Sequence, residues 1–359
     1  MGKVFHQSGL RNDRDELNSW SEKNVRIPRT IYHEGGKAVQ AVSEQQRDGR
    51  ILLDDYTTDA AIQTLRRVAE DWKKKQKNFF VAVGLKKPHL NFIFPDKFLE
   101  YYPNVSMPVN PTASKNLPNR AWIRSSEIRG RKEYLDYIRN WSKDTPLPDW
   151  IARELRTGYY SCITYIDSLI GEILQELEDL ELSKDTIVSF IGDHGFHLGE
   201  HNIVGKNTAF EVANNSPMII RIPGITDNGH VSDKLVEFVD LFPTMAEHAT
   251  LPTLTTCPSN TCGFDESKVV YRRGKHRPIV HRHEDTEMEG PSVLPVPTLC
   301  GVYAQKFCMG YSMRAQQYRY TEWVTYDYVD EKADWSNLCG AELYDHYTDP
   351  SETNNIEMK

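Results

Sequence analysis

The chain has 359 residues, of which 39% are hydrophobic and 26% charged, and its formal net charge is −8 at pH 7. This composition is ordinary for a globular protein, and the acidic balance argues against a nucleic-acid partner, which needs a basic surface. No apolar run is long enough to span a bilayer, and the opening MGKVFHQSGL lacks the apolar core of a signal peptide. The length predicts one large domain, with room for a second, smaller one.

Helical and strand patterns alternate along the first three quarters of the chain. Residues 58–72 form an apolar stripe at helical spacing, with Thr58 and Asp59 placed to cap it, and residues 155–177 form a second stripe. Apolar runs predict buried strands at 78–85 and 186–191 and a further strand at 217–224. An amphipathic run predicts a helix at 233–249. Such alternation indicates an α/β sheet with helices on both faces.

Two stretches depart from this alternation. Residues 87–150 are rich in proline and aromatic residues, which predicts a long surface excursion. Beyond residue 272 a proline-rich stretch leads into the alternating aromatic residues 309–329, which predict an antiparallel hairpin or meander. We therefore expect a core domain over residues 1–272 and a small C-terminal α+β subdomain over residues 273–359.

Cysteines and glycan acceptor triplets bear on the compartment of the protein. Cys257 and Cys262 bracket one short loop and Cys300 and Cys308 another, so two local disulfides are one interpretation and free thiols the other. The N-x-S/T triplets that accept N-linked glycans occur at Asn104, Asn140 and Asn214. Together these features favour the secretory route.

The stretch IGDHGFHLGEHNIVGK, residues 191–206, follows directly on a predicted buried strand. A carboxylate at the mouth of a core is costly to desolvate unless a cation meets it, so we expect a positive partner near Asp193. The segment KKPH, which contains His89, also follows a predicted strand. Because ligands of α/β sheets bind beyond the carboxyl ends of the strands, the two segments are expected to meet in one cleft.

The loop admits two chemical interpretations. HLGEH at 197–201 matches the H-x-x-E-H motif of a class of zinc peptidases, but that motif needs a helix, and Gly195 and Gly199 interrupt this segment. The alternative makes Asp193 a ligand of a hard divalent cation and Lys206 a contact for an anionic substrate. On chemistry alone His194 is either a second ligand or an ordinary loop histidine.

Further cationic candidates stand at the start of the chain, where GKVFH contains Lys3 and His6. Each of these residues, taken singly, is more often structural or solvated than catalytic. A cleft that joins lysines, histidines and a metal ion suits an ester of sulfate or phosphate, because several cations can share the charge of the oxyanion.

Several longer segments occur together in one order, namely GKVFH, FFVAVGLKKPHLNFIFPDKF, IGDHGFHLGEHNIVGKNTAFEVANNSPMIIRIPG, DLFPTMA, MGYSMRAQQYRYTEW and GAELYDHYTDPSETNN. In these segments the chain resembles the sulfatase family, and within it the iduronate 2-sulfatase branch, over nearly its whole length. The resemblance implies an alkaline-phosphatase-like α/β/α sandwich with a small C-terminal α+β subdomain. It also implies one Ca2+ ion and hydrolysis of sulfate esters by a formylglycine hydrate made from a cysteine.

The resemblance implies roles for individual residues as well. Asp193 and His194 match the metal-binding pair of the family, and Lys206 matches the lysine that contacts the sulfate. The four residues that match catalytic positions are Lys3, His6, His89 and Lys206. For protonation of the leaving alcohol we prefer His89 to His6, because His89 lies on the core of the predicted sheet.

The chain departs from the family pattern at the nucleophile. The family places two metal-binding aspartates and a C-x-P-S-R motif before G-K-x-x-H, whereas this chain begins at that segment and none of its cysteines fits the motif. Asp54 and Asp55 lie downstream, in a variable connection, and we do not take them as the missing pair. The named residues therefore form a half-site, and the chain alone is expected to be inactive. Asn207 stands where close relatives carry an aromatic residue, which puts specificity for iduronate in doubt.

The sequence thus predicts a sulfuric ester hydrolase that acts on glycosaminoglycan 2-O-sulfate, with a sulfated uronic-acid glycosaminoglycan as its partner and a lysosomal or secreted location. One alternative is a non-catalytic, sulfatase-like isoform that at most binds sulfated glycan. Another is a phosphodiesterase of the same superfold, which the joint occurrence of GKVFH and KKPH disfavours.

Overall fold

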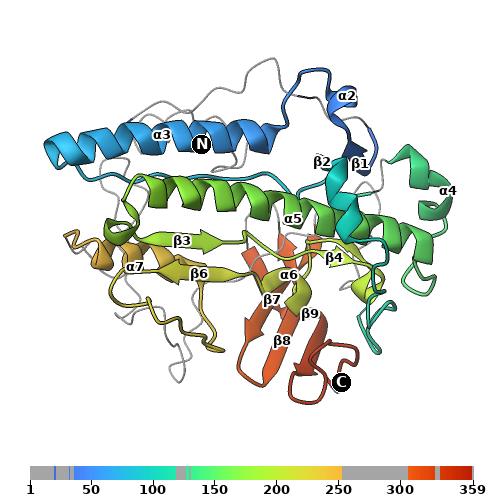
Figure 1. The fold of residues 1–359 in the computed structure, drawn as a ribbon. Helices are drawn as coiled ribbons and strands as arrows, with labels where there is room; N and C mark the ends of the chain where they lie inside the picture. The colour runs from blue at the N-terminus through green and yellow to red at the C-terminus, as the bar shows by residue number, and fades with distance from the viewer. Residues whose placement is uncertain are drawn as a thin grey trace. The chain divides into compact units, whose positions relative to one another are not determined.

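A computed structural model describes residues 20–21, 32, 36–118, 127–128, 131–252, 306–327 and 332–357 (Figure 1). The chain divides into two compact units, each of which is described by itself. Unit 1 comprises Met1–Leu117, Trp122–Lys184 and Gly195–Asn207, and unit 2 comprises Pro118–Ala121, Asp185–His194 and Thr208–Lys359. The predicted domain boundary after residue 272 lies outside the described residues and stays a prediction.

Two long helices dominate unit 1, α3 (Leu53–Lys75) and α5 (Asp149–Asp179), and they pack side by side (Figure 1). Helix α5 contains the predicted stripe at 155–177, which confirms that helix. Helix α3 begins five residues before the predicted start, so Thr58 and Asp59 lie inside the helix and do not cap it. The cap is formed instead by the Asp55 carboxylate, which accepts a hydrogen bond from the Leu52 amide at 3.2 Å.

A short parallel pair of strands, β1 (Val39–Val42) and β2 (Phe92–Pro95), packs against α5. Phe92 and Phe94 are fully buried in the core of unit 1. The close approach depends on Gly158 of α5, because a Cβ atom there would lie 2.8 Å from the Val39 side chain. Strand β2 lies within the stretch that the composition predicts to be a surface excursion, and that prediction is wrong for these residues.

The strand expected at 78–85 is not found, since no named strand of the described chain covers that segment. Phe80 within it is 78% exposed. An apolar run becomes a strand only where a neighbour pairs with it. Strand β1 pairs with residues 92–95, with Val39 opposite Phe92. Among the described residues no named strand pairs with the apolar run at 78–85, so that run does not form a strand.

The remaining elements of unit 1 are short. They are α2 (Glu44–Arg47), η1 (Asp96–Tyr101), η2 (Lys132–Tyr134), α4 (Leu135–Ile138), β4 (His197–Leu198), η4 (Glu200–Asn202) and β5 (Val204–Gly205). A further turn of 3-10 helix, η3 (Ser183–Asp185), leads out of the long helix α5. Strands β4 and β5 pair antiparallel and form a small hairpin that carries the H-x-x-E-H stretch.

Unit 2 contains an antiparallel pair, β3 (Val188–Ile191) and β6 (Met218–Arg221), and the short helix α6 (Glu211–Asn214). Both strands lie within predicted strand segments, but alternate residues face outward, and Ile191 and Ile219 are 40% and 64% exposed. Both strands are therefore half-buried, whereas β3 was expected to be buried.

The predicted helix at 233–249 is much shorter in the structure. It consists of η5 (Phe238–Asp240) followed by α7 (Leu241–His248). Pro243 lies in the first turn of α7, where its missing amide hydrogen is not needed. A helix that began at residue 233 would hold this proline in its interior, at a cost of about 3 kcal/mol.

The C-terminal part of unit 2 is a three-stranded antiparallel meander of β7 (Lys306–Arg314), β8 (Tyr318–Asp327) and β9 (Lys332–Asp345). This confirms the meander predicted from the aromatic alternation. A disulfide joins Cys308 of β7 to Cys339 of β9. It excludes the predicted Cys300–Cys308 bridge, because the Cys308 sulfur is already bonded to Cys339 and can form only one disulfide. Cys257 and Cys262 lie outside the described residues.

Candidate functional site

Asp193 and His194 follow strand β3 in unit 2, as the motif requires. The Gly192 amide that precedes them donates to the Pro217 carbonyl at 2.9 Å, which fixes the end of the strand. His194 Nε2 lies 3.6 Å from Asp193 Oδ2, and the two side chains are 33% and 65% exposed respectively. His194 is thus the neighbour of the Asp193 carboxylate, which is largely exposed, and the expectation of a positive partner for Asp193 stays a prediction.

Two side chains are too few to make a calcium site. Calcium takes six to eight oxygen ligands, and a histidine nitrogen is not a preferred one. In the part of the chain that the structure describes, Asp193 belongs to no group of three or more candidate ligands. Asp193 and His194 thus supply at most a portion of a metal site.

Lys206 directly follows β5, at the end of the hairpin over 197–206 in unit 1. This hairpin is held by a buried polar side chain, that of Asn202, which is fully enclosed. Its Oδ1 accepts from Trp141 Nε1 at 2.7 Å and from the Leu147 amide at 2.9 Å. Its Nδ2 donates to the carbonyls of Ser142, Lys143 and Thr145. The base from which Lys206 projects is therefore tied to the 141–147 segment.

The residues of the H-x-x-E-H match are engaged in this structural role. Glu200 accepts from Arg156 Nη1 at 2.7 Å and from the Leu198 amide at 2.6 Å. His197 Nδ1 lies 3.0 Å from the Glu200 carbonyl oxygen, and His201 Nε2 lies 3.0 Å from Asn110 Nδ2. Burial, and then the neighbouring His201, lower the pKa of His197 to about 3, so this imidazole is neutral.

The zinc interpretation fails on this geometry. The segment is a β-hairpin with a 3-10 turn, and His201 adopts a left-handed conformation with φ of 56°. The motif needs a helix that presents both histidines on one face. The glutamate that would act as general base is instead paired with Arg156.

The KKPH segment forms a compact turn anchored by a carboxylate from α3. Asp54 accepts hydrogen bonds from the amides of Lys86 and Lys87 at 2.6 and 3.1 Å. Burial raises the pKa of Asp54, and these two amides act in the opposite direction. Lys87 is buried, and its Nζ donates to the carbonyls of His89 and Asn91. Sequence reasoning missed this anchor, since the only signal was a pair of adjacent aspartates.

His89 is half-buried in this turn. Its amide donates to the Lys86 carbonyl at 2.9 Å, and its Nδ1 lies 2.5 Å from the Leu90 carbonyl oxygen. A carbonyl can only accept, so Nδ1 carries the proton and the orientation of the ring is fixed.

Asp54 and Asp55 both have structural contacts. Asp54 holds the KKPH turn. Asp55 accepts from the Tyr165 hydroxyl at 2.6 Å and from the Leu52 amide, and it lies 3.8 Å from Arg47.

The predicted site residues are distributed over both units. His89 and Lys206 belong to unit 1, and Asp193 and His194 belong to unit 2. Lys3 and His6 lie outside the described residues. The meeting of these residues in one cleft therefore stays a prediction.

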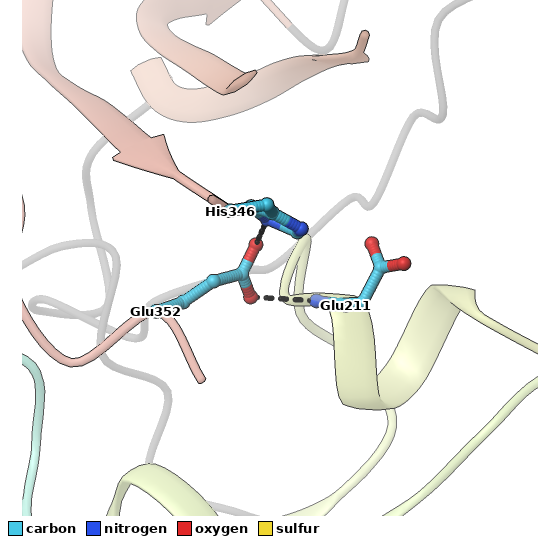
Figure 2. Close-up of side chains that lie close together, drawn as sticks. All are labelled: Glu211, His346 and Glu352. Atoms are coloured by element: carbon cyan, nitrogen blue, oxygen red, sulfur yellow. Dashed lines mark hydrogen bonds and ion pairs between the residues drawn. The ribbon is translucent and has the colours of Figure 1, made fainter. Parts of the chain in front are cut away.

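A second cluster of candidate ligands, which sequence reasoning did not identify, lies in unit 2. Its members are Glu211, His346 and Glu352, whose ligand atoms lie within 4.8 Å of one another (Figure 2). Glu352 is 1% exposed, and it accepts from His346 Nε2 at 2.9 Å and from the Glu211 amide at 2.7 Å. Two carboxylates and an imidazole are a donor set that a metal ion can use.

Two arginines already neutralise this cluster. Arg319 donates to Glu352 Oε1 at 2.6 Å and also to Glu211, and Arg314 donates to Glu211 at 3.1 Å. Burial alone would raise the pKa of Glu211, but the Arg319 guanidinium outweighs it and the pKa is lowered. A metal ion would have to displace Arg319, so the arrangement is better explained as an ion-pair network that joins α6, the meander and the 352 turn.

Comparison with known proteins decides the family. The profile of the family named Sulfatase matches residues 11–251, which is more than half of the chain. The chain belongs to the sulfatase family. It is 28% identical to iduronate 2-sulfatase of Mus musculus over 99% of this chain and 73% of that protein. The family places the chain among the sulfuric ester hydrolases.

Solved structures show the fold. A putative sulfatase from Bacteroides fragilis superposes with a TM-score of 0.53 at 20% identity, over 86% of this chain and 55% of that one. The phosphonate monoester hydrolase of Silicibacter pomeroyi gives a TM-score of 0.56 at 18% identity, over 91% and 62%. The predicted α/β fold of alkaline-phosphatase-like type, with a small C-terminal strand subdomain, is confirmed.

The chain is shorter than all three of these proteins and spans between 55% and 73% of their lengths. Among its described helices, none has the length and apolarity that a membrane crossing requires.

Proposed function

We propose that this sulfatase recognises 2-O-sulfated uronic acid residues of a glycosaminoglycan, and that their sulfate ester is hydrolysed only where the formylglycine nucleophile of the family is also present. The likeness to iduronate 2-sulfatase over 99% of the chain carries the proposal. The order of KKPH, GDHG and Lys206 along the chain supports it. The structure of the 197–206 hairpin adds a physical reason. Lys206 stands at the end of a well-anchored hairpin, and a cation held in place in this way suits a compact anion such as a sulfate ester.

Each candidate residue has a role in this proposal. Lys206, Lys3 and the metal site hold sulfate oxygens and offset their charge. Asp193 and His194 provide part of the site for a Ca2+ ion, which, when bound, draws charge from the sulfate. The nucleophile of the family is a formylglycine hydrate, whose oxygen attacks sulfur.

His89 is the proposed acid for the leaving alcohol. Its Nδ1 proton points at the Leu90 carbonyl, so the second proton of the imidazolium form sits on Nε2. That proton passes to the alcohol oxygen as the sulfur–oxygen bond breaks, which leaves a neutral ring and a neutral alcohol.

A second function is favoured by one observation: none of the six cysteines lies in a C-x-P-S-R sequence. A chain that acts without this motif would bind sulfated glycan and not hydrolyse it. We propose that the chain alone has no turnover, because lysines and a partial metal site cannot replace the covalent step.

The proposed location is lysosomal or secreted. The disulfide between Cys308 and Cys339 supports it, because such bonds persist mainly in oxidising compartments.

The test separates binding from turnover. Hydrolysis of an aryl sulfate and of a 2-O-sulfated uronate disaccharide is measured with and without Ca2+, and disaccharide binding is measured by calorimetry. We expect no turnover, and binding that Lys206→Ala weakens at least tenfold, whereas Lys74→Ala, at an exposed position of α3, has no effect. Calcium-dependent turnover that survives repurification would contradict inactivity, and equal binding by both variants would contradict the role of Lys206.

A further inference from the structure

The three N-x-S/T triplets differ in whether the side-chain amide of the acceptor asparagine is exposed or hydrogen-bonded within the fold. Attachment of a glycan replaces one hydrogen of the asparagine Nδ2 by a bulky sugar, so the folded protein must leave that amide accessible. Whether it does so can be read separately at each position.

Asn104 stands on an exposed turn between η1 and the buried Val105. Ser106, the hydroxyl residue of the triplet, is exposed as well. The backbone between them is held by Arg153, whose Nη1 donates to the Val105 carbonyl at 3.1 Å. A sugar on Asn104 would therefore extend from a fixed segment without displacing a packed group.

Asn140 is exposed at the end of the turn that follows α4, and its neighbour Trp141 is anchored in the core by the bond to Asn202. Beside it lies a hollow of about 290 Å³, lined by residues 136–138, 140–141 and 145–148. The lining includes Tyr137, which is 46% exposed, and two prolines. Such apolar faces suit the C–H face of a sugar ring.

Asn214 is different, because its amide is part of the fold. It closes the short helix α6, and its Nδ2 donates to the carbonyls of Thr208 at 3.2 Å and Phe210 at 3.0 Å. Both amide hydrogens are thus used. The hydroxyl of Ser216 in the same triplet is buried, and it packs so closely on Gly192 that a Cβ there would lie 2.4 Å from it. A sugar on Asn214 would break at least one of these bonds.

We propose that the folded protein carries N-linked glycans at Asn104 and Asn140 but not at Asn214, and that the first sugar on Asn140 rests in the adjacent hollow. The donor is an oligosaccharide linked to a lipid diphosphate. The bond from the sugar C1 to the diphosphate oxygen breaks, a bond from C1 to Nδ2 forms, one amide proton is released and the lipid diphosphate leaves. The proposal rests on the secretory route inferred above.

Occupancy is tested on the full chain directed into the secretory pathway of cells that make high-mannose glycans. Protein with the Cys308–Cys339 bond formed is treated with peptide N-glycosidase in heavy-oxygen water, and converted asparagines are identified by mass spectrometry. We expect conversion at 104 and 140 only. Ser106→Ala and Ser142→Ala should each remove one site. Conversion at 214 in the folded fraction, or none at 104 and 140, would overturn the assignment.

The hollow is tested with glycans trimmed to the first sugar. Ser106→Ala, which keeps only the sugar on Asn140, is compared with Ser106→Ala/Asn140→Gln. The matched control compares Ser142→Ala, which keeps only the sugar on Asn104, with Ser142→Ala/Asn104→Gln. We expect the sugar on Asn140 to raise the midpoint of thermal unfolding by about 2 °C and the sugar on Asn104 to leave it unchanged. Equal shifts in the two pairs would show that the hollow does not hold the sugar.

Discussion

Arg156 of α5 and Glu200 of the 197–206 hairpin form an ion pair, with Nη1 and Oε1 2.7 Å apart and the side chains only 8% and 17% exposed. The second oxygen of Glu200 accepts the Leu198 amide, and Nη2 of Arg156 donates to the Tyr160 hydroxyl at 2.6 Å. The pair thus joins the helix to the turn that precedes Lys206. Removal of one member would leave the other charged and buried.

We expect Glu200→Ala to lower the free energy of unfolding by about 3–5 kcal/mol, because Arg156 loses its counter-charge. The double variant Glu200→Ala/Arg156→Met should recover part of this loss. Urea unfolding followed by circular dichroism measures both. The control is Glu70→Ala, which removes an exposed pair with Lys74 and should cost less than about 1 kcal/mol. A similar cost at both positions would show that the pair does not stabilise the hairpin.

Asp54→Ala should destabilise the protein by about 2–5 kcal/mol, because the amides of Lys86 and Lys87 lose their acceptor inside the protein. Asp54→Asn keeps an acceptor oxygen for one amide and should cost less. Denaturant unfolding measures the effect on stability. If Asp54→Ala were as stable as the parent chain, the anchoring of the KKPH turn would have to lie elsewhere.

Calcium affinity tests whether Asp193 is a metal ligand and whether Asp54 has only a structural role. With only Asp193 and His194 as identified candidates, we expect a dissociation constant above roughly 1 mM, in the range of sites with low ligand charge. Asp193→Asn should abolish what binding there is, and Asp54→Asn should leave it unchanged. Calorimetric titration measures both. Micromolar affinity that depends on Asp54 would reverse the two assignments.

Sequence-based prediction succeeds best for elements whose structure follows from their own local residue pattern. Helix α5 was predictable because residues 155–177 keep one apolar stripe, and the meander because aromatic residues alternate through β7 and β8. Asp193 and His194 could be located because the motif stands directly after a strand.

Features that depend on distant partners could not be predicted in this way. The start of α3 depends on the Asp55 side chain reaching back to Leu52, and β2 depends on pairing with β1. The partner of Cys308 lies 31 residues away, across a strand. The role of Asn202 follows only from its contacts with residues some 55 to 61 positions earlier. Local patterns carry no information about such pairings.

Glu342 makes the stability of the meander depend on pH. It is buried, and its two oxygens accept from Trp323 Nε1 at 2.6 Å and from the Tyr344 hydroxyl at 2.7 Å. Burial raises its pKa from 4.5 to about 7, and the nearby Glu352 acts in the same direction, against the two hydrogen bonds and Arg319. The folded state therefore holds a proton that the unfolded state releases between these two values.

The contribution of this proton to stability is complete below about pH 4.5 and is lost as the pH rises through about 7. The loss is on the order of 3 kcal/mol between pH 4.5 and 8. Glu342→Gln should remove this part of the pH dependence, whereas Glu322→Gln, at a half-buried position of β8, should keep it. Urea unfolding of the three proteins at pH 5 and pH 8 measures the difference. An unchanged pH dependence in Glu342→Gln would show that another group titrates.

Asn202→Asp tests how the 197–206 hairpin that ends at Lys206 is anchored, because the two side chains have nearly the same size. The new carboxylate would face the carbonyls of Ser142, Lys143 and Thr145, where Nδ2 now donates. The three carbonyl oxygens would lose their donor and would face a buried negative charge. We therefore expect the free energy of unfolding to fall by more than about 3 kcal/mol. Amide hydrogen exchange at Val204 and Gly205 should accelerate, since β5 then opens more often. Asn207→Asp, five residues on and exposed, is the matched control and should change neither quantity. Slow exchange in the Asn202→Asp protein would mean that β4 and β5 hold the hairpin without this side chain.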